Sequence, residues 1–531
     1  MDTEPIISGE AREVTRAAAL ISVGNISSRL LGLVREMVKS YFFGAGGAVS
    51  AFDIAAQVPT MLYDLIAGGM LSSALVPIFS DYADPERRAE LWRLLSLLIS
   101  LLTLVLGIFV LILEVTAPAV ARILGKDLPL EYLNLATQMI RITTPAILFL
   151  NLSGLFSGVL YALRAFERPA FTAAVSNATR VVVVVLLGWS VLGSRSLALG
   201  LLIGSVAQVA IQWPALKGGR LRFVMPFVSH PALRVIGKLY LPIGLGLIMD
   251  QAAVALSFNL ASRTGLSGIA WMRYAAYLIQ FPLGMVVSAV SLAILPTLSR
   301  YAFDGEDEEF SATLAQGLRL VLTLVLPAAV GMMVLAEPLV ALVLQRGNFM
   351  PSDTLATAQA LRANLLGLVF AALDQPLITA FYARKDTWTP ALVGVVTTVF
   401  YTALVLTPST FMTLSLNTLI FANSLKLTAH ALLMLFLFRR RVGPMQPYGV
   451  KRTTIISLVA SALMALPMLG TRLLVNRLSL PGLAGVLTQV VFAGGVGALF
   501  YLFLMRQMGS EELDLIRRAV LQRWNQRSQM E

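Results

Sequence analysis

The first long apolar segment of the chain contains four charged residues, Arg29, Arg35, Glu36 and Lys39. Arg35 and Lys39 are four residues apart and share one face of a helix, whereas Arg29 and Glu36 lie seven apart on a neighbouring stripe. A charged side chain at membrane depth is costly, so it faces a cavity or a partner. Because the planar guanidinium of arginine binds phosphate oxygens in pairs, these residues predict a site for an anionic group such as a pyrophosphate.

A purely local interpretation of the same residues predicts no binding site. In that interpretation Glu36 pairs with a basic neighbour, and the long side chain of Lys39 extends to the membrane surface. It leaves Arg29 without an acidic residue within one helical turn.

Other apolar segments also contain charged residues. One interpretation is a set of ion pairs between helices that only fixes their packing. The other is a hydrated cavity of net positive potential, suited to an anion. The residues concerned are Asp53, Asp64, Asp250, Arg273, Arg362 and Asp374.

The composition places these residues in a membrane. Hydrophobic residues make up 57% of the 531 residues and charged residues only 13%, whereas a soluble globular protein has about 25% charged residues. A bilayer accommodates such a chain because lipid-facing positions can be apolar. The net charge of +12 indicates basic cytoplasmic loops rather than a nucleic-acid partner, since no basic and aromatic cluster lies outside the apolar segments.

The apolar stretches predict an all-α polytopic membrane protein with about 14 transmembrane helices of about 20 residues or more. The predicted inner loops hold more Lys and Arg than the outer loops, so both termini are expected to be cytoplasmic. The first span is expected to be retained, because no cleavage site follows it. The predicted spans are 17–43, 49–80, 91–117, 133–160, 170–193, 197–217, 234–261, 269–301, 309–336, 354–382, 390–408, 413–438, 452–475 and 481–507.

An internal repeat relates two parts of the chain. ALVPIFSDYA at 74–83 resembles AILPTLSRYA at 293–302, and YALR at 161–164 resembles YARK at 382–385. Equivalent points are six spans apart, so both copies cross the membrane in the same direction, with the substrate route between them. The predicted organisation is a cytoplasmic tail at 1–16, an N-lobe at 17–217, a C-lobe at 218–438, two further helices within 439–507, and a cytoplasmic tail at 508–531.

We expect no enzyme activity. The chain has no cysteine, which excludes disulfides and thiol catalysis, and its two histidines, His230 and His430, match no metal-ligand spacing. The sequence also contains no HExxH, GxSxG or P-loop motif, so ATP-driven pumping by this chain is not expected.

Several short motifs resemble those of one transporter family, and they follow the family's order along the chain. They are SRLLGLVRE at 28–36 with FGAG at 43–46, AWM at 270–272 with FP at 281–282, QRGNF at 345–349, and YARKDT at 382–387 before TP at 389–390. With these motifs the chain resembles the MurJ (MviN) family of lipid II flippases.

The resemblance implies a fold like that of the MATE transporters, within the multidrug/oligosaccharidyl-lipid/polysaccharide exporter superfamily. It has two six-helix lobes, and two extra helices form a lipid groove. It also implies alternating access that carries lipid II, the undecaprenyl-pyrophosphate-linked peptidoglycan precursor, outward across the cytoplasmic membrane. Arg29 and Arg35 match the two family arginines that are expected to meet the pyrophosphate.

The chain departs from the family pattern at several charged positions. The arginine pair of span two falls on Tyr63 and Asp64, and the Asp-Arg pair of span eight falls on Ala276 and Tyr277. Arg273 lies one turn before Tyr277 and is expected to supply the missing charge. In addition, the acid that follows the FGAG turn is replaced by Ser50, with Asp53 nearby.

Some family members also bind sodium through an acidic residue in span seven and polar groups in spans eleven and twelve. Asp250 fits the acidic ligand, but span eleven offers Thr397, Thr398 and Tyr401 without an acid or amide, which disfavours a sodium site. No other cofactor is expected. The expected partners are lipid II or a similar polyprenyl-pyrophosphate glycolipid and membrane lipids, with the chain acting as a monomer.

The lost arginines leave two alternatives open. One is an exporter of the same fold that moves another polyprenyl-linked glycan or a drug. The other is a membrane paralogue that transports nothing.

Overall fold

The computed structural model describes residues 4–68, 75–216, 219, 221, 231–409, 415–443, 448–478 and 482–513. Every regular element among these residues is a helix, which confirms the predicted all-α class. Helix α1 begins at Glu4, so the predicted 1–16 tail is helical from that residue onward. His230 and residues 514–531 of the predicted C-terminal tail lie outside the described residues.

The chain divides into two compact units. Unit 1 comprises Met1–Ala270 and Arg346–Met350, and unit 2 comprises Trp271–Gln345 and Pro351–Glu531. The predicted lobe boundary at residue 218 lies before α9 (Pro231–Ser262), whereas the boundary between the two compact units lies after α9. Helix α9 belongs to unit 1 because it contacts α4 and η1. The lobes inferred from the repeat stay a prediction.

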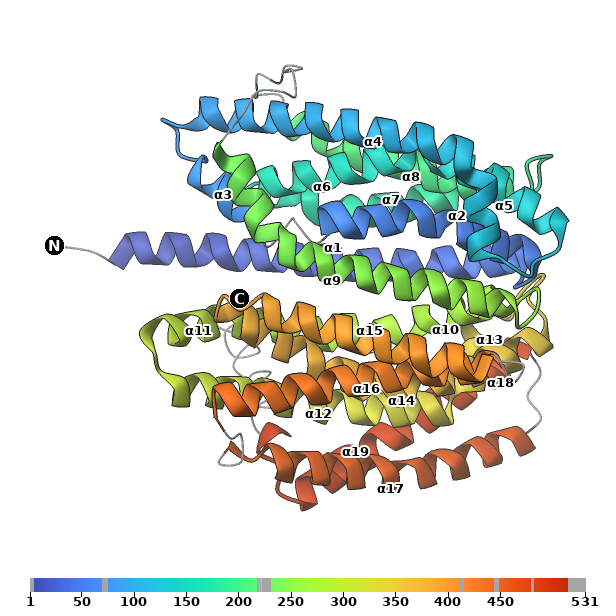
Figure 1. Ribbon diagram of the computed structural model, residues 1–531. Coiled ribbons are helices and arrows are strands. Elements are labelled where there is room, and N and C mark those ends of the chain that lie inside the picture. Colours follow the sequence, from blue (N-terminus) through green and yellow to red (C-terminus); the bar gives the residue numbers. More distant parts are fainter. Residues whose placement is uncertain are drawn as a thin grey trace. The chain divides into compact units, whose positions relative to one another are not determined.

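Unit 1 is a set of long helices that run along one another, with α4, α6, α7 and α8 side by side in Figure 1. Helix α7 packs on both α1 and α8. The elements are α1 (Glu4–Phe43), α2 (Gly47–Tyr63), η1 (Asp64–Gly68), α3 (Val76–Asp81), α4 (Arg88–Leu124), α5 (Leu130–Thr143), α6 (Ala146–Ala162), α7 (Glu167–Leu187), α8 (Arg195–Gln212), η3 (Trp213–Leu216) and α9, while α10 (Gly268–Pro282) contains the boundary to unit 2.

Unit 2 is also helical. Its last helices pack through α17 onto α12, where Met464, Met468 and Tyr501 form a buried cluster. Its elements are η4 (Leu283–Val287), α11 (Ser288–Asp304), α12 (Asp307–Val334), α13 (Ala336–Leu344), α14 (Pro351–Ala383), α15 (Trp388–Ser409), α16 (Leu416–Arg441), α17 (Val450–Arg477), α18 (Gly482–Thr488), η6 (Gln489–Ala493) and α19 (Gly494–Gln507).

The chain is a multi-pass membrane protein. Within the described residues, 11 helices are long and apolar enough to cross a membrane, or up to 12 if the bent pair α5 and α6 forms one span. The bend of 41° in that pair coincides with Pro145, which cannot donate a backbone hydrogen bond. The prediction of about 14 spans is not confirmed by this set, which does not include α1 or α2.

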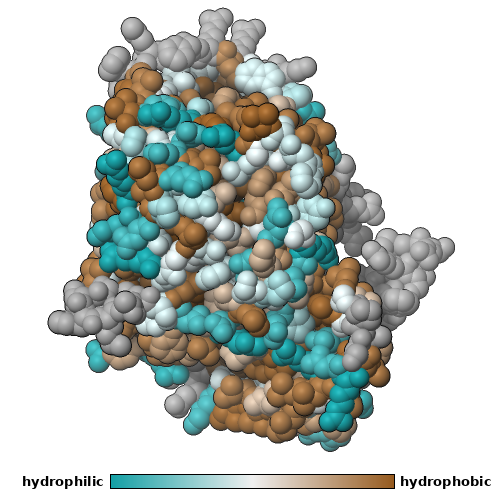
Figure 2. Space-filling model, turned by 90° about the vertical axis from the view of Figure 1, so that its right-hand side faces the viewer, coloured by the Kyte–Doolittle hydropathy of each residue, from teal (hydrophilic) through white to brown (hydrophobic). Residues whose placement is uncertain are grey.

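The last two helices expose apolar side chains to the surroundings. Leu466, Leu473 and Leu474 of α17 are each 65–66% exposed. Figure 2 shows hydrophobic side chains gathered at the bottom of the view, the level at which α17 lies in Figure 1. Lipid contact is the expected environment for such a surface.

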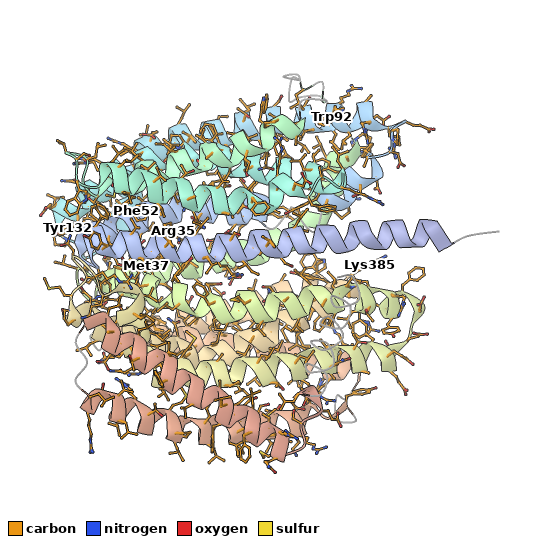
Figure 3. All side chains as sticks on the ribbon, turned by 180° about the vertical axis from the view of Figure 1, so that it is seen from behind. Arg35, Met37, Phe52, Trp92, Tyr132 and Lys385 are labelled. Carbon is orange, nitrogen blue, oxygen red and sulfur yellow. The ribbon has the colours of Figure 1, made fainter. Side chains whose placement is uncertain are left out.

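The internal repeat has a counterpart in the backbone. Among the described residues, Arg164 and Lys385 are the non-glycine residues with positive φ, 56° and 60°. These two positions correspond in the repeat, and each ends a helix, α6 and α14, just before the next begins. Both copies therefore reverse the chain with the same left-handed turn, which is uncommon outside glycine. Lys385 is labelled in Figure 3.

Two of the short motifs contact each other inside unit 1. The backbone N–H of Asn348 donates to the carbonyl of Tyr41 at 3.0 Å. Gly44 has φ of +65°, and a Cβ there would lie 2.4 Å from the carbonyl oxygen of Asn348. Gly347 has φ of +58°, and a Cβ there would lie 2.2 Å from the carbonyl oxygen of Tyr41. Both glycines are required because two backbones meet without room for a side chain.

Glu512 anchors the end of the described chain to α12 and α17. Its carboxylate accepts hydrogen bonds from Arg319 Nε at 2.5 Å, Thr453 Oγ1 at 2.7 Å and Ser510 Oγ at 2.7 Å. Burial acts to raise the pKa of Glu512, but the hydrogen bonds from Ser510, Thr453 and Arg319 outweigh it and lower the pKa below its ordinary value.

This lowered pKa makes stability depend on pH. Glu512 contributes its full stabilisation where it is ionised in both the folded and unfolded states, above the ordinary glutamate pKa of about 4.3. The contribution is lost as the pH falls below that value toward the lowered folded-state pKa. We expect the melting temperature in detergent to fall with acidification over this range, and Glu512→Gln to flatten the decrease. Parallel curves for the two proteins would contradict this assignment.

Candidate functional site

A chain of ion pairs links α1 to α2 inside unit 1. Arg35 Nη2 lies 2.7 Å from Glu36 Oε1, and Lys39 Nζ lies 2.7 Å from Glu36 Oε2. Lys39 Nζ also lies 3.2 Å from Asp53 Oδ1 on α2. In Figure 3, Arg35 lies on the side of α1 toward the other helices of this unit, and Met37 lies on the opposite side. The sequence-predicted residues Arg35, Glu36 and Asp53 are thus brought together.

The network is buried. Glu36, Lys39 and Asp53 are 7%, 4% and 3% exposed. The predicted local pairing of Glu36 with its basic neighbours is confirmed. The expectation that Lys39 extends to the membrane surface is wrong, because the turn after α1 brings Asp53 alongside it and the ammonium pairs there instead. Buried charges persist when such partners compensate their desolvation.

Arg35 also ties α1 to α7. Its Nη1 donates to Asn177 Oδ1 at 2.9 Å, and Asn177 Nδ2 donates to the carbonyl of Ser28 at 3.0 Å. The amide therefore orients the guanidinium from one side while Glu36 holds it from the other. Sequence reasoning missed Asn177, although an amide in an otherwise apolar helix is a signal that it has a hydrogen-bond partner.

The remaining predicted residues of unit 1 lie at other places on its helices. Arg29 is half-buried on α1, before the network along the same helix, and Asp64 is half-buried in η1. Asp250 is exposed on α9. No group of three or more His, Asp or Glu side chains that could hold a metal ion occurs among the described residues.

The predicted residues of unit 2 have partners of their own. Asp374 Oδ1 lies 2.8 Å from His430 Nδ1 and links α14 to α16. Arg362 Nε donates to the carbonyl of Met333 at 3.4 Å, and Arg273 is half-buried on α10. The Asp374–His430 pair agrees with the interpretation of interhelical pairs that fix packing. His430, which matched no metal spacing in the sequence, is this packing partner.

The comparisons with known proteins decide the family. The family model for the lipid II flippase MurJ matches residues 39–488. The chain belongs to the MurJ family. The resemblance seen in the sequence motifs is therefore confirmed, as is the MATE-like fold class.

Curated members of the MurJ family cover most of the chain. A probable lipid II flippase MurJ of Vibrio cholerae is 30% identical over 401 residues, covering 73% of this chain and 76% of that relative. The lipid II flippase MurJ of Burkholderia cenocepacia is 29% identical over 392 residues, covering 72% and 75%. A probable lipid II flippase MurJ of Bdellovibrio bacteriovorus is 26% identical over 521 residues, covering 96% and 98%.

Solved structures share the fold. The lipid II flippase MurJ in an inward closed conformation matches with a TM-score of 0.75 at 22% identity, covering 92% of this chain and 99% of that one. An inward-facing MATE multidrug transporter matches with a TM-score of 0.66 at 15% identity, covering 82% and 99%.

One departure from the MurJ family pattern has a structural role. Ser50, which replaces the acid after the FGAG turn, is fully buried, and its Oγ donates to the carbonyl of Leu266 at 2.6 Å. It holds the start of α2 to the segment between α9 and α10. The nearby Asp53 pairs with Lys39 instead. The position is therefore used for packing.

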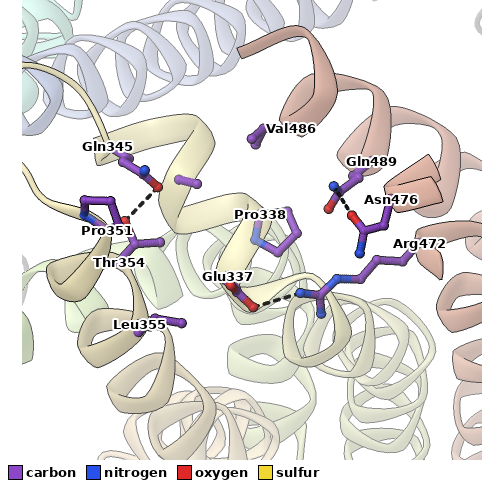
Figure 4. A pocket seen from close by; sticks show the side chains of 11 residues that line it. Glu337, Pro338, Gln345, Pro351, Thr354, Leu355, Arg472, Asn476, Val486 and Gln489 are labelled. Carbon is purple, nitrogen blue, oxygen red and sulfur yellow. Dashed lines mark hydrogen bonds and ion pairs between the residues drawn. The ribbon is translucent and has the colours of Figure 1, made fainter. Parts of the chain in front are cut away.

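Unit 2 contains a cavity of about 330 Å³, shown in Figure 4. Glu337 of α13 pairs with Arg472 of α17 at 2.8 Å, and Gln489 Nε2 donates to Asn476 Oδ1 at 2.5 Å. Arg472 Nη1 also donates to the carbonyl of Val334 at 3.1 Å. These contacts hold the last two helices of this MurJ-family chain against the end of α12, and sequence reasoning did not foresee them.

Proposed function

We propose that the chain moves lipid II from the inner to the outer face of the bacterial cytoplasmic membrane by alternating access. The observation that carries this proposal is the match of residues 39–488 to the lipid II flippase MurJ family. We also propose that the chain is a transporter rather than an enzyme, and that it works without a cofactor, a sodium ion being disfavoured. We propose that it works as a monomer.

The arginines of α1 are the proposed ligands of the pyrophosphate. Arg35 is the better placed by geometry, because Glu36 and Asn177 orient its guanidinium and 26% of its side chain remains exposed. A preorganised guanidinium loses less entropy when it binds a phosphate. Arg29 adds positive charge earlier on the same helix. The buried ion pairs that Lys39 forms with Glu36 and Asp53 hold Glu36, and through it Arg35, in place.

Complementation tests the proposed function. The full chain is expressed in a bacterium depleted of its own lipid II flippase, and lipid II at the outer leaflet is measured by an accessibility assay. We expect growth and outward lipid II to be restored. No rescue together with no binding of purified lipid II would overturn the proposal. Binding of another undecaprenyl-pyrophosphate glycan in its place would favour the related exporter, which the departures at Asp64 and Tyr277 motivate.

Arg273 is proposed to compensate for the family arginine that falls on Tyr277. It is half-buried on α10, one turn before that position. We expect Arg273→Ala to reduce outward lipid II in the accessibility assay at unchanged protein level. Intact flipping by Arg273→Ala, alongside loss of flipping by Arg35→Ala, would contradict the compensation.

The proposed orientation places both termini in the cytoplasm. The absence of cysteine allows single cysteines to report it without a background. Glu86 and Lys126 are exposed in loops on either side of α4, so they lie on opposite sides of the membrane in this orientation. We expect a membrane-impermeant maleimide to label Lys126→Cys in intact spheroplasts, and Glu86→Cys only after permeabilisation. The reverse pattern would invert the topology.

A further inference from the structure

Arg180 is an arginine in the apolar helix α7 that the ion-pair network does not use. It lies well inside α7, away from both ends of the helix, and is followed by the run Val181–Val185. Its stem packs on α8, where a Cβ built on Gly204 would lie 3.1 Å from Arg180 Cγ. The glycine therefore makes room for this side chain. A charged residue at such a position is a functional candidate by default because burying it is costly.

Arg180 lies on the face of α7 that meets the α1 network. Asn177 and Arg180 are three residues apart on α7 and share one face of the helix. Asn177 accepts a hydrogen bond from Arg35, so this face of α7 is the one that meets Arg35. Arg180 also interacts electrostatically with both Arg35 and Glu36. The two guanidinium groups of Arg35 and Arg180 thus belong to one site.

Both carboxylates of the α1 network are paired with cations other than Arg180. Glu36 is shared by Arg35 and Lys39, and Asp53 pairs with Lys39. In the described part of the chain, Arg180 forms no ion pair with either carboxylate, and its buried Nε has no hydrogen-bond partner. Arg180 and the α1 network together comprise three cationic side chains and two carboxylates. A buried donor without an acceptor carries its full desolvation penalty, which an incoming anion would relieve.

We propose that Arg180 is a ligand of the diphosphate group of the transported lipid, acting together with Arg35. A diphosphate has enough oxygens to accept from two guanidinium groups at once. Arg180 thereby supplies from α7 part of the positive charge that the family pattern places at Asp64 and Tyr277, where this chain has none. The inference rests on the proposed function and names a residue that sequence comparison with the family motifs does not reach.

The test is binding of undecaprenyl pyrophosphate and undecaprenyl phosphate to the purified full chain, measured by native mass spectrometry. Arg180→Met keeps the length of the stem but removes the charge. We expect this variant to weaken the binding of undecaprenyl pyrophosphate roughly ten- to a hundredfold, and to weaken the binding of undecaprenyl phosphate less. Arg180→Lys should recover part of the affinity. Arg168→Met is the matched control, since Arg168 lies on the same helix and donates to the carbonyl of Ile211 at 3.2 Å.

The outcomes separate this inference from the proposed function. An unchanged affinity in Arg180→Met would overturn the role of Arg180, even where the wild-type chain binds and flips lipid II. If the wild-type chain neither binds nor flips lipid II but binds undecaprenyl pyrophosphate through Arg180, lipid II is not the substrate, and the role of Arg180 as a diphosphate ligand still holds. If Arg180 has only a structural role, Arg180→Met will have a lower melting temperature than the wild-type chain. If Arg180 binds the diphosphate and has no ion-pair partner within the protein, the melting temperature of Arg180→Met will be equal or higher.

Discussion

Replacing Glu36 by glutamine is expected to lower the free energy of unfolding by about 3–5 kcal/mol. The carboxylate of Glu36 lies 2.7 Å from both Arg35 Nη2 and Lys39 Nζ, and its side chain is only 9% exposed. Its removal leaves the buried Lys39 and the partly buried Arg35 without the carboxylate that they share. Breaking a buried ion pair by removing one partner costs more than the pair contributes, because the remaining charge stays desolvated. Unfolding in SDS mixtures measures the change.

An exposed ion pair provides the matched control. Arg87 and Glu90 are 3.4 Å apart on α4, and their side chains are 48% and 59% exposed. Glu90→Gln is expected to change the free energy of unfolding by less than about 1 kcal/mol, as surface pairs do. Asp53→Asn should fall between the two, since Lys39 keeps Glu36 as a partner. Equal effects of Glu36→Gln and Glu90→Gln would show that the α1 network does not stabilise the fold.

The helical class and the local ion pairs of α1 could be predicted from the sequence because both depend on local patterns. Apolar stretches of spanning length indicate helices whatever their neighbours are. The spacing of Arg35, Glu36 and Lys39 on one helix allows a local ion pair, which the structure contains. The repeat could also be found, since the turns at Arg164 and Lys385 need the same backbone conformation in each copy.

The partners across helices could not be predicted in this way. The choice for Lys39 between the membrane surface and Asp53 depends on how α2 returns beside α1, which no local pattern encodes. Asn177 contacts Arg35 from a helix more than 140 positions away in the chain. Arg180 could be noticed in the sequence as an arginine within an apolar run. Its relation to Arg35 becomes clear only from the face of α7 on which it lies.

Arg35→Ala is expected to abolish flipping, with a loss of more than about tenfold in outward lipid II, since a charge-assisted bidentate contact contributes about 1.5–3 kcal/mol. Arg35→Lys keeps a positive charge beside Glu36 but loses the planar fork, so we expect it to retain only part of the activity. The measurement is the outer-leaflet accessibility assay in flippase-depleted cells, normalised to the amount of protein in the membrane.

Asn177→Ala separates the substrate role of Arg35 from its role in packing. This variant removes the 2.9 Å contact that ties Arg35 to α7 and leaves the guanidinium and its pair with Glu36 in place. If Arg35 mainly joins two helices, Asn177→Ala and Arg35→Ala will lose similar activity and stability. If Arg35 binds the pyrophosphate, Asn177→Ala will weaken flipping modestly through looser positioning, while Arg35→Ala removes it. A small effect of Arg35→Ala on flipping would place the anion site elsewhere.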